Sequence, residues 1–177
     1  MEGFYVKAHV GKKLRQYIIW SYGSDTIPLR RDATLTAIIK PHLALSPKDF
    51  IEPYPDDEMV FIEIPKMREK VYNHAKGKSY YCNTLWRDTL SNKGHKRVYE
   101  FFNSNLRNSF FIFMDGYTEA QYTNENDKCY LKIKEGIAAF FSQYHIDYNE
   151  KMIAAYARSW YRHREENEKN RVSPLVF

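Results

Sequence analysis

Histidine, cysteine and acidic side chains are the groups in this chain that could bind a metal or act as catalysts. The 177 residues include six histidines and two cysteines, Cys82 and Cys129. The histidines show neither HxxxH nor HExxH spacing, and the cysteines form neither a CxxC pair nor the even set of a disulfide scaffold. We therefore predict no metal site, no cofactor and no disulfide framework.

One segment contains the residue types of a metal-dependent nuclease. Pro55-Asp56 is followed by Glu63 and Lys66. Strand side chains alternate between two faces, so a carboxylate and a lysine must be two residues apart to meet one metal, and here they are three apart. The chain also lacks the GxGxxG, GxxxxGK[ST] and GxSxG motifs. The sequence therefore indicates a protein without enzymatic activity.

Basic residues are concentrated in two segments of the chain. The chain has 27 Lys and Arg against 22 Asp and Glu, a formal net charge of +5. Residues 66–97 hold nine basic and two acidic side chains, and residues 151–177 hold six and three. Uneven basic charge is typical of polyanion-binding proteins, because cations attract phosphates and release counterions. The alternative is a lysine-rich surface whose acidic partners come from elsewhere in the fold.

The cations of the last segment repeat with helical spacing. Four of them fall within an arc of about 40° on a wheel of about 100° per residue, and they are Lys151, Arg158, Arg162 and Lys169. The apolar side, which includes Tyr156 and Trp160, lies opposite. A helix buried through its aromatic side therefore presents this row of cations to solvent or to a phosphate backbone.

We predict a nucleic-acid-binding protein, a small regulator or accessory factor of transcription or replication, with DNA favoured over RNA as partner. The predicted binding residues are Lys76, Lys78, Lys93, Lys96, Arg97, Lys151, Arg158, Arg162 and Lys169. Pairing between residues four apart on the helix, Arg162 with Glu166 and Glu165 with Lys169, is the alternative explanation for part of the row. The alternative function is a structural or adaptor protein that forms a homo-oligomeric or protein–protein interface.

The elements that position these residues differ between the two halves of the chain. Runs rich in β-branched and aromatic residues predict strands, and they cover residues 4–10, 16–22 and 58–64. A short helix is expected at 33–40, ended by Pro41. Three prolines predict a loop at 46–57, with the acidic run Asp56-Asp57-Glu58 as a solvated turn.

After Pro65 the apolar spacing becomes helical. Helical segments are expected at 67–75 and 80–90, followed by a break at 91–94. The next helix has a buried face that repeats every four residues, Val98, Phe102, Leu106 and Phe110, and a polar loop is expected at 118–127.

Two further helices are expected at 129–144 and 148–170. The turn between them has no glycine where many helix-turn-helix motifs require a positive φ, which weakens the interpretation as such a motif; the residue there is His145, and histidine tolerates this conformation better than most. Asp147 or Asn149 is expected to cap the last helix. The final pair therefore resembles a helix-turn-helix in its order of elements.

The predicted fold is α+β. A small N-terminal antiparallel sheet with one short helix is followed by a bundle of about four helices that ends in the helix-turn-helix-like pair. The parts are residues 1–65 and 66–177, or one compact domain overall. No apolar stretch approaches the roughly 18–20 residues of a membrane span, and no secretory signal is recognisable. We therefore predict a cytoplasmic protein that does not bind membranes.

Overall fold

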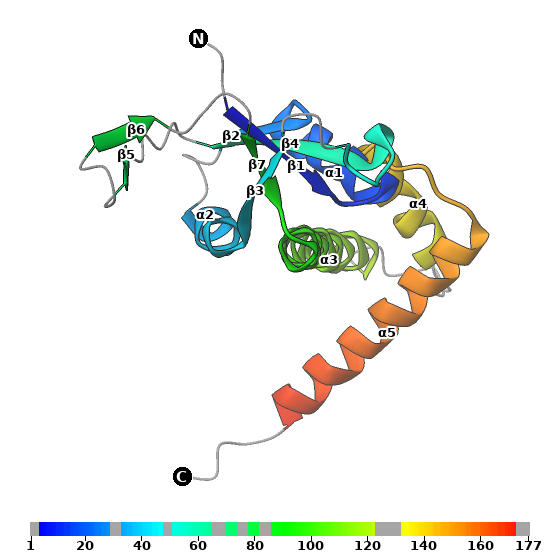
Figure 1. Cartoon of the computed structure of the whole chain (residues 1–177). Helices are drawn as coiled ribbons and strands as arrows, with labels where there is room; N and C mark the ends of the chain where they lie inside the picture. The colour runs from blue at the N-terminus through cyan, green and yellow to red at the C-terminus, as the bar shows by residue number, and fades with distance from the viewer. Residues whose placement is uncertain are drawn as a thin grey trace, which may run out of the picture. The chain divides into compact units, whose positions relative to one another are not determined.

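The protein has a mixed α+β fold in two compact units, Met1–Asn103 and Ser104–Phe177. The computed structural model describes residues 4–28, 33–47, 51–64, 70–73, 78–81, 86–122 and 132–172. Helix α3, Asn92–Tyr122, begins in the first unit and ends in the second. The first unit holds the strands, and the second holds the helix pair α4 and α5 (Figure 1).

A three-stranded sheet of order β1-β4-β2 forms the core of the first unit. Strand β1, Phe4–His9, pairs antiparallel with β4, Met59–Ile64, which confirms two of the three predicted strands. Strand β2, Thr26–Pro28, pairs parallel with β4, so the prediction of an all-antiparallel sheet is wrong. The long connection between β2 and β4 contains helix α2, which allows a parallel crossover.

The segment predicted as a strand at 16–22 is part of helix α1, Lys12–Tyr22, and that prediction is wrong. Its buried side chains follow the i, i+3, i+4 spacing of one helix face, and they are Leu14, Tyr17 and Ile18. Gly23, with φ of 71°, ends the helix in the left-handed conformation that favours glycine. In Figure 1, α1 lies beside strands β1 and β4.

The next elements return the chain to strands. Helix α2, Ala33–Ile39, confirms the short helix. It is followed by a 3₁₀ turn, Lys40–His42, and by strand β3, Leu43–Pro47, which overlaps the start of the predicted loop. Within that loop, residues Asp56–Glu58 form a 3₁₀ turn, η3.

Both helical segments predicted between residues 67 and 90 are wrong. Strand β5, Lys70–Asn73, pairs antiparallel with β6, Lys78–Tyr81. Strand β7, Trp86–Leu90, pairs antiparallel with β3. The partner of β7 lies far back in the chain, and local apolar spacing carries no information about such a partner.

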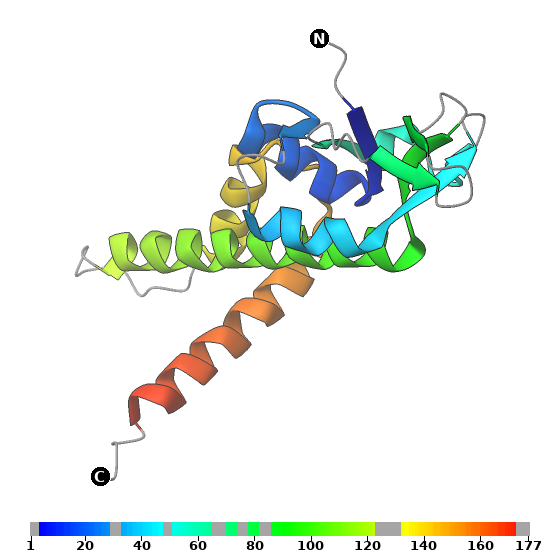
Figure 2. The ribbon, with the colours of Figure 1, turned by 60° about the vertical axis from the view of Figure 1, so that its left-hand side comes forward.

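Helix α3 begins where the sequence predicted a break between helices. The Ser91 hydroxyl accepts a hydrogen bond from the Gly94 amide at 3.2 Å and so caps the first turn. The four-residue repeat from Val98 to Phe110 is buried, as predicted. The helix then continues without interruption to Tyr122 (Figure 2), so the loop expected from residue 118 starts too early.

The last two helices are confirmed. Helix α4 covers Ile133–Gln143, and helix α5 covers Glu150–Val172. Residues 129–131, where the earlier start of α4 was predicted, lie outside the described residues. In the described part after residue 66 there are three helices rather than about four, because the first expected helical segments are strands.

Candidate nucleic-acid interface

Helix α4 ends in a turn that contains a left-handed residue. His145 has φ of 52°, so it adopts the conformation that a glycine would adopt more readily at this position. The Ile146 amide donates to the Phe141 carbonyl at 2.9 Å, and the His145 amide donates to the Ser142 carbonyl at 3.2 Å. These two bonds form the Schellman motif, which satisfies carbonyls that a helix end leaves free. The end of α4 is therefore fixed by backbone hydrogen bonds.

Helix α5 begins with a side-chain cap. The Asn149 side-chain oxygen accepts a hydrogen bond from the Met152 amide at 3.0 Å, and the Asn149 carbonyl accepts one from the Ile153 amide at 3.0 Å. Asn149 is thus the cap, of the two residues expected for that position. Residues 144–149 separate the two helices, a longer connection than the turn of three or four residues usual in helix-turn-helix motifs.

Aromatic packing fixes the rotation of α5 about its axis. Trp160 is completely buried, with its ring centroid 6.4 Å from that of Phe110. Tyr156 meets Phe110 and Phe141 edge-on, each at 4.8 Å between ring centroids. Edge-to-face pairs at such distances are favourable beyond the area they bury. One side of α5 is therefore held against the aromatic core of the second unit.

The last of these contacts is made by His163. Its ring stacks on Phe111 at 4.0 Å and 2°, and its Nε2 lies 4.0 Å from an Asp115 carboxylate oxygen. The Arg107 guanidinium lies 5.8 Å from the centroid of the same Phe111 ring. Beyond this point, residues 165–169 are all exposed. Figures 1 and 2 both show the second half of α5 extending away from α4.

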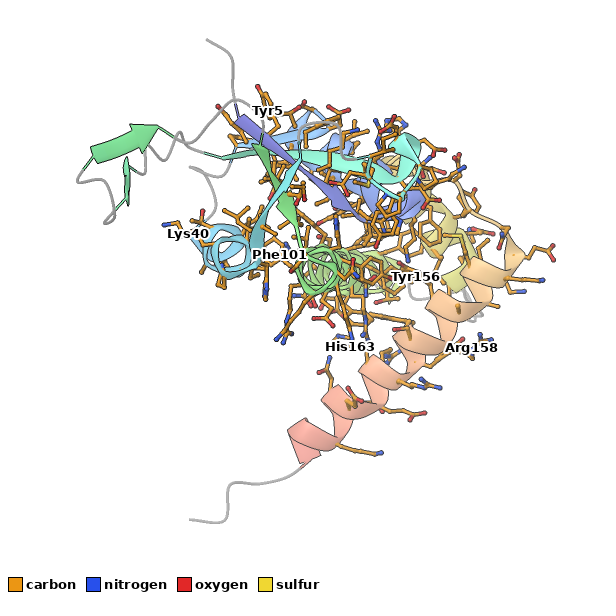
Figure 3. All side chains as sticks on the ribbon, viewed as in Figure 1. Tyr5, Lys40, Phe101, Tyr156, Arg158 and His163 are labelled. Carbon is orange, nitrogen blue, oxygen red and sulfur yellow. The ribbon has the colours of Figure 1, made fainter. Side chains whose placement is uncertain are left out.

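The predicted row of cations lies on the exposed side of α5. All four of its members are exposed, and they are Lys151, Arg158, Arg162 and Lys169. Figure 3 shows Arg158 on the side of the helix turned away from His163. Within the described residues none of the four forms an ion pair, whereas Arg164 lies 3.4 Å from Glu168. The alternative pairing of Arg162 with Glu166 is therefore not formed.

The other predicted binding residues are brought together only in part. Three of them are exposed in the first turns of α3, and they are Lys93, Lys96 and Arg97. Lys96 and Arg97 lie 4.0 and 3.0 Å from the carboxylate of Glu100. Lys76 lies outside the described residues, and Lys78 lies in strand β6. The four cations of the row on α5 thus have no carboxylate partner in the described part, and the same holds for Lys93 on α3.

The acidic turn η3 is a connecting element that the sequence analysis missed. Each of its carboxylates meets a cationic or imidazole side chain from β1 or α1, and the pairs are Lys7–Asp56 at 2.8 Å, His9–Glu58 at 2.9 Å and Lys12–Asp57 at 2.9 Å. The hydrogen bond between Lys12 and Asp57 raises the pKa of the lysine and lowers the pKa of the carboxyl. The predicted turn is solvated, with Asp56 and Asp57 exposed, and its carboxylates in addition connect it to β1 and α1.

Two histidines and a tyrosine form a cluster beside η3. The His9 ring stacks on the Tyr54 ring at 4.2 Å between centroids. The His95 ring meets the same Tyr54 ring edge-on, at 5.1 Å between centroids. The His9 amide donates to His95 Nδ1 at 3.0 Å, so the neutral imidazole carries its proton on Nε2. That nitrogen lies 3.9 Å from a Glu52 oxygen, and both side chains are buried.

Burial lowers the pKa of His95, and the nearby His9 lowers it further. A hydrogen bond with the Leu90 backbone raises the pKa, but by less than the two other effects lower it. One ring nitrogen accepts a backbone bond and the other faces a buried carboxylate, so His95 offers no nitrogen to a substrate. The position of His95, one helical turn before Val98, was the sequence signal that it belongs to the buried face.

Nothing in the described residues points to a metal or a membrane. No group of three or more His, Cys, Asp or Glu side chains is placed to hold a metal ion in that part of the chain. None of its helices combines the length and the apolar character that crossing a membrane requires. No family model, curated protein or solved structure matches the chain.

Proposed function

We propose that the protein binds nucleic acid through helix α5 and carries out no reaction on it, as a small regulator or accessory factor of transcription or replication. The observation that supports this proposal is the exposed row of four unpaired cations on α5. A row with carboxylate partners would lose most of its attraction for phosphates, because each partner screens a cation at close range. No carboxylate of the described residues lies within ion-pair distance of the α5 row.

The rigidity of the second unit adds to this support. Trp160 and Tyr156 hold one side of α5 in the aromatic core, and the cations lie opposite them. A phosphate contact made from a helix that is already oriented requires less ordering on binding than a contact from a flexible tail.

The test is the salt dependence of DNA binding, measured by fluorescence anisotropy with a labelled duplex between 50 and 200 mM salt. Replacing Arg158 and Arg162 by alanine removes two adjacent cations of the row. At about 0.9 per lost phosphate contact, the slope of log K against log salt should decrease by about 1.8.

A matched control removes the same charge from other positions of the second unit. Arg164→Ala with Lys134→Ala deletes one cation that is paired with Glu168 and one exposed cation on α4. This variant should keep the parent slope. Equal losses in both double variants would show that only net charge matters. Absence of salt-dependent binding by the parent would reject the proposal in favour of the adaptor function.

A further inference from the structure

The row on α5 is a straight and rigid array of charge. Residues 150–172 contain neither glycine nor proline, so no kink is expected along the helix. At about 1.5 Å per residue, the row from Lys151 to Lys169 extends over about 27 Å, and Arg158 and Arg162 are about 6 Å apart along it. A partner that matches such an array carries negative charges at fixed spacings of its own.

The row lacks what single-stranded nucleic acid requires. Proteins that bind single strands place exposed aromatic rings among their cations, so that bases stack on them. On α5, Trp160 is buried, Tyr156 is packed between Phe110 and Phe141, and His163 is stacked on Phe111. Tyr161 is exposed beside Arg158, three residues further along the helix, so α5 offers one ring to a base and not a succession of rings for successive bases.

The start of α5 is equally unsuited to reading bases. Recognition helices usually contact base edges through their first turns. Here Asp147 and Glu150 are both exposed at that end, and phosphates flanking a groove repel them. The cations begin at Lys151 and continue toward the other end of the helix. Contacts from this row therefore go to phosphates, which position a protein on DNA but carry no sequence information.

Resting on the proposed function, we infer that α5 binds the phosphate backbone of double-stranded DNA and does not read its base sequence. A duplex presents one negative charge per 1.7 Å of axis, so about 16 charges face or flank a 27 Å row. If duplex and single strand bind equally at 1 M salt, four contacts at about 0.9 on a duplex, against about 0.7 on a single strand, correspond to about a sixfold preference for the duplex at 0.1 M salt.

The experiment measures anisotropy of the full chain with two 20-base-pair DNA duplexes of unrelated sequence and with their separated strands. The expected result is equal affinity for the two DNA duplexes and about sixfold weaker binding of each single strand at 0.1 M salt. In the Arg158→Ala, Arg162→Ala variant this preference should shrink to about 2.5-fold, since two of the four contacts are lost.

The outcomes separate the inference from the function on which it rests. Single strands bound as tightly as the DNA duplexes would overturn the inference and leave nucleic-acid binding intact. A strong preference for one of the two DNA sequences would overturn the absence of base reading. A preference for duplex that the double variant keeps in full would place the duplex contacts outside α5. No binding to any of the probes would overturn the inference and the proposed function together.

Discussion

The first unit and helix α5 use the same basic residue types in opposite ways. In the first unit, Lys7, Lys12 and Arg15 each meet a carboxylate of η3 or of Asp25, and they connect strands to helices. On α5, the four cations of the row have no such partner within the described residues. These three cations of the first unit therefore stabilise the fold, whereas the four cations on α5 remain available to a partner.

The largest loss of stability is expected for Trp160, the buried ring that holds α5 against the rest of the second unit and so turns its cations outward. Trp160→Ala should cost about 3–5 kcal/mol of unfolding free energy, and Phe102→Ala in the first unit should cost a similar amount, because both rings are fully buried. Urea denaturation followed by circular dichroism measures both.

A conservative variant refines the first test. The indole nitrogen of Trp160 is buried without a hydrogen-bond partner among the described residues. Trp160→Phe removes that unpaired donor along with part of the ring, so it should cost clearly less than Trp160→Ala. A loss under about 1 kcal/mol for Trp160→Ala would mean that the ring does not anchor α5.

The next effect concerns a cation that serves the fold. Arg15 donates through Nε to the Met59 carbonyl at 3.0 Å and through its terminal nitrogen to Asp25 at 3.2 Å. Arg15→Ala should destabilise the protein by about 1.5–3 kcal/mol, in the range for hydrogen bonds that involve a charged group. Thermal and urea unfolding measure the change. If the Arg15→Ala protein were as stable as the parent, the cations of the first unit would not stabilise the fold, and they would not differ in this respect from the cations on α5.

A pH-dependent effect is expected from the histidine cluster of the first unit. The folded state lowers the pKa of His95 below its ordinary value of 6.5, so the unfolded chain takes up the proton first as the pH falls. Stability should be unaffected by this group well above pH 6.5 and should decrease below it. Stability measured from pH 7.5 to 5 tests this expectation.

The control for the pH effect is His95→Asn. The asparagine oxygen can accept the His9 amide in place of Nδ1 but does not titrate. The stability of this variant should therefore change less than that of the parent between pH 6.5 and 5. Identical pH profiles for the two proteins would show that protonation of His95 is not coupled to folding.

The smallest effect on stability is expected on the α5 row itself. Arg158→Ala with Arg162→Ala removes two exposed cations that have no carboxylate partner, so the unfolding free energy should change by no more than about 0.5 kcal/mol. Chemical denaturation of the double variant beside Arg15→Ala gives the direct comparison. A loss as large as that of Arg15→Ala would assign a structural role to the row.

Helical spacing in the sequence was sufficient to predict the elements around α5. The buried face from Val98 to Phe110 and a cap at Asp147 or Asn149 follow from local rules, and the structure selects Asn149. The α5 row was likewise predictable, because a wheel of one helix needs no information from the rest of the fold. That the four cations of the row form no ion pair could be seen only in the structure.

Predictions failed where distant segments decide the local conformation. The run at 16–22 has β-branched and aromatic residues, yet its buried Tyr17 and Ile18 favour a helix packed on the sheet. Strand β7 depends on β3, and the His95 cluster joins residues from three separate segments. Contacts of this kind leave no periodic trace in a single sequence.

The pairing of β3 with β7 also has a consequence for the order of events during synthesis. Residues 48–85 lie between the two strands, and contacts over such separations form slowly because a long loop must close first. At about 5–20 residues per second, β3 emerges about 2–9 s before β7 is complete. During that interval the edge of β3 has no partner strand, and another nascent chain can pair with it.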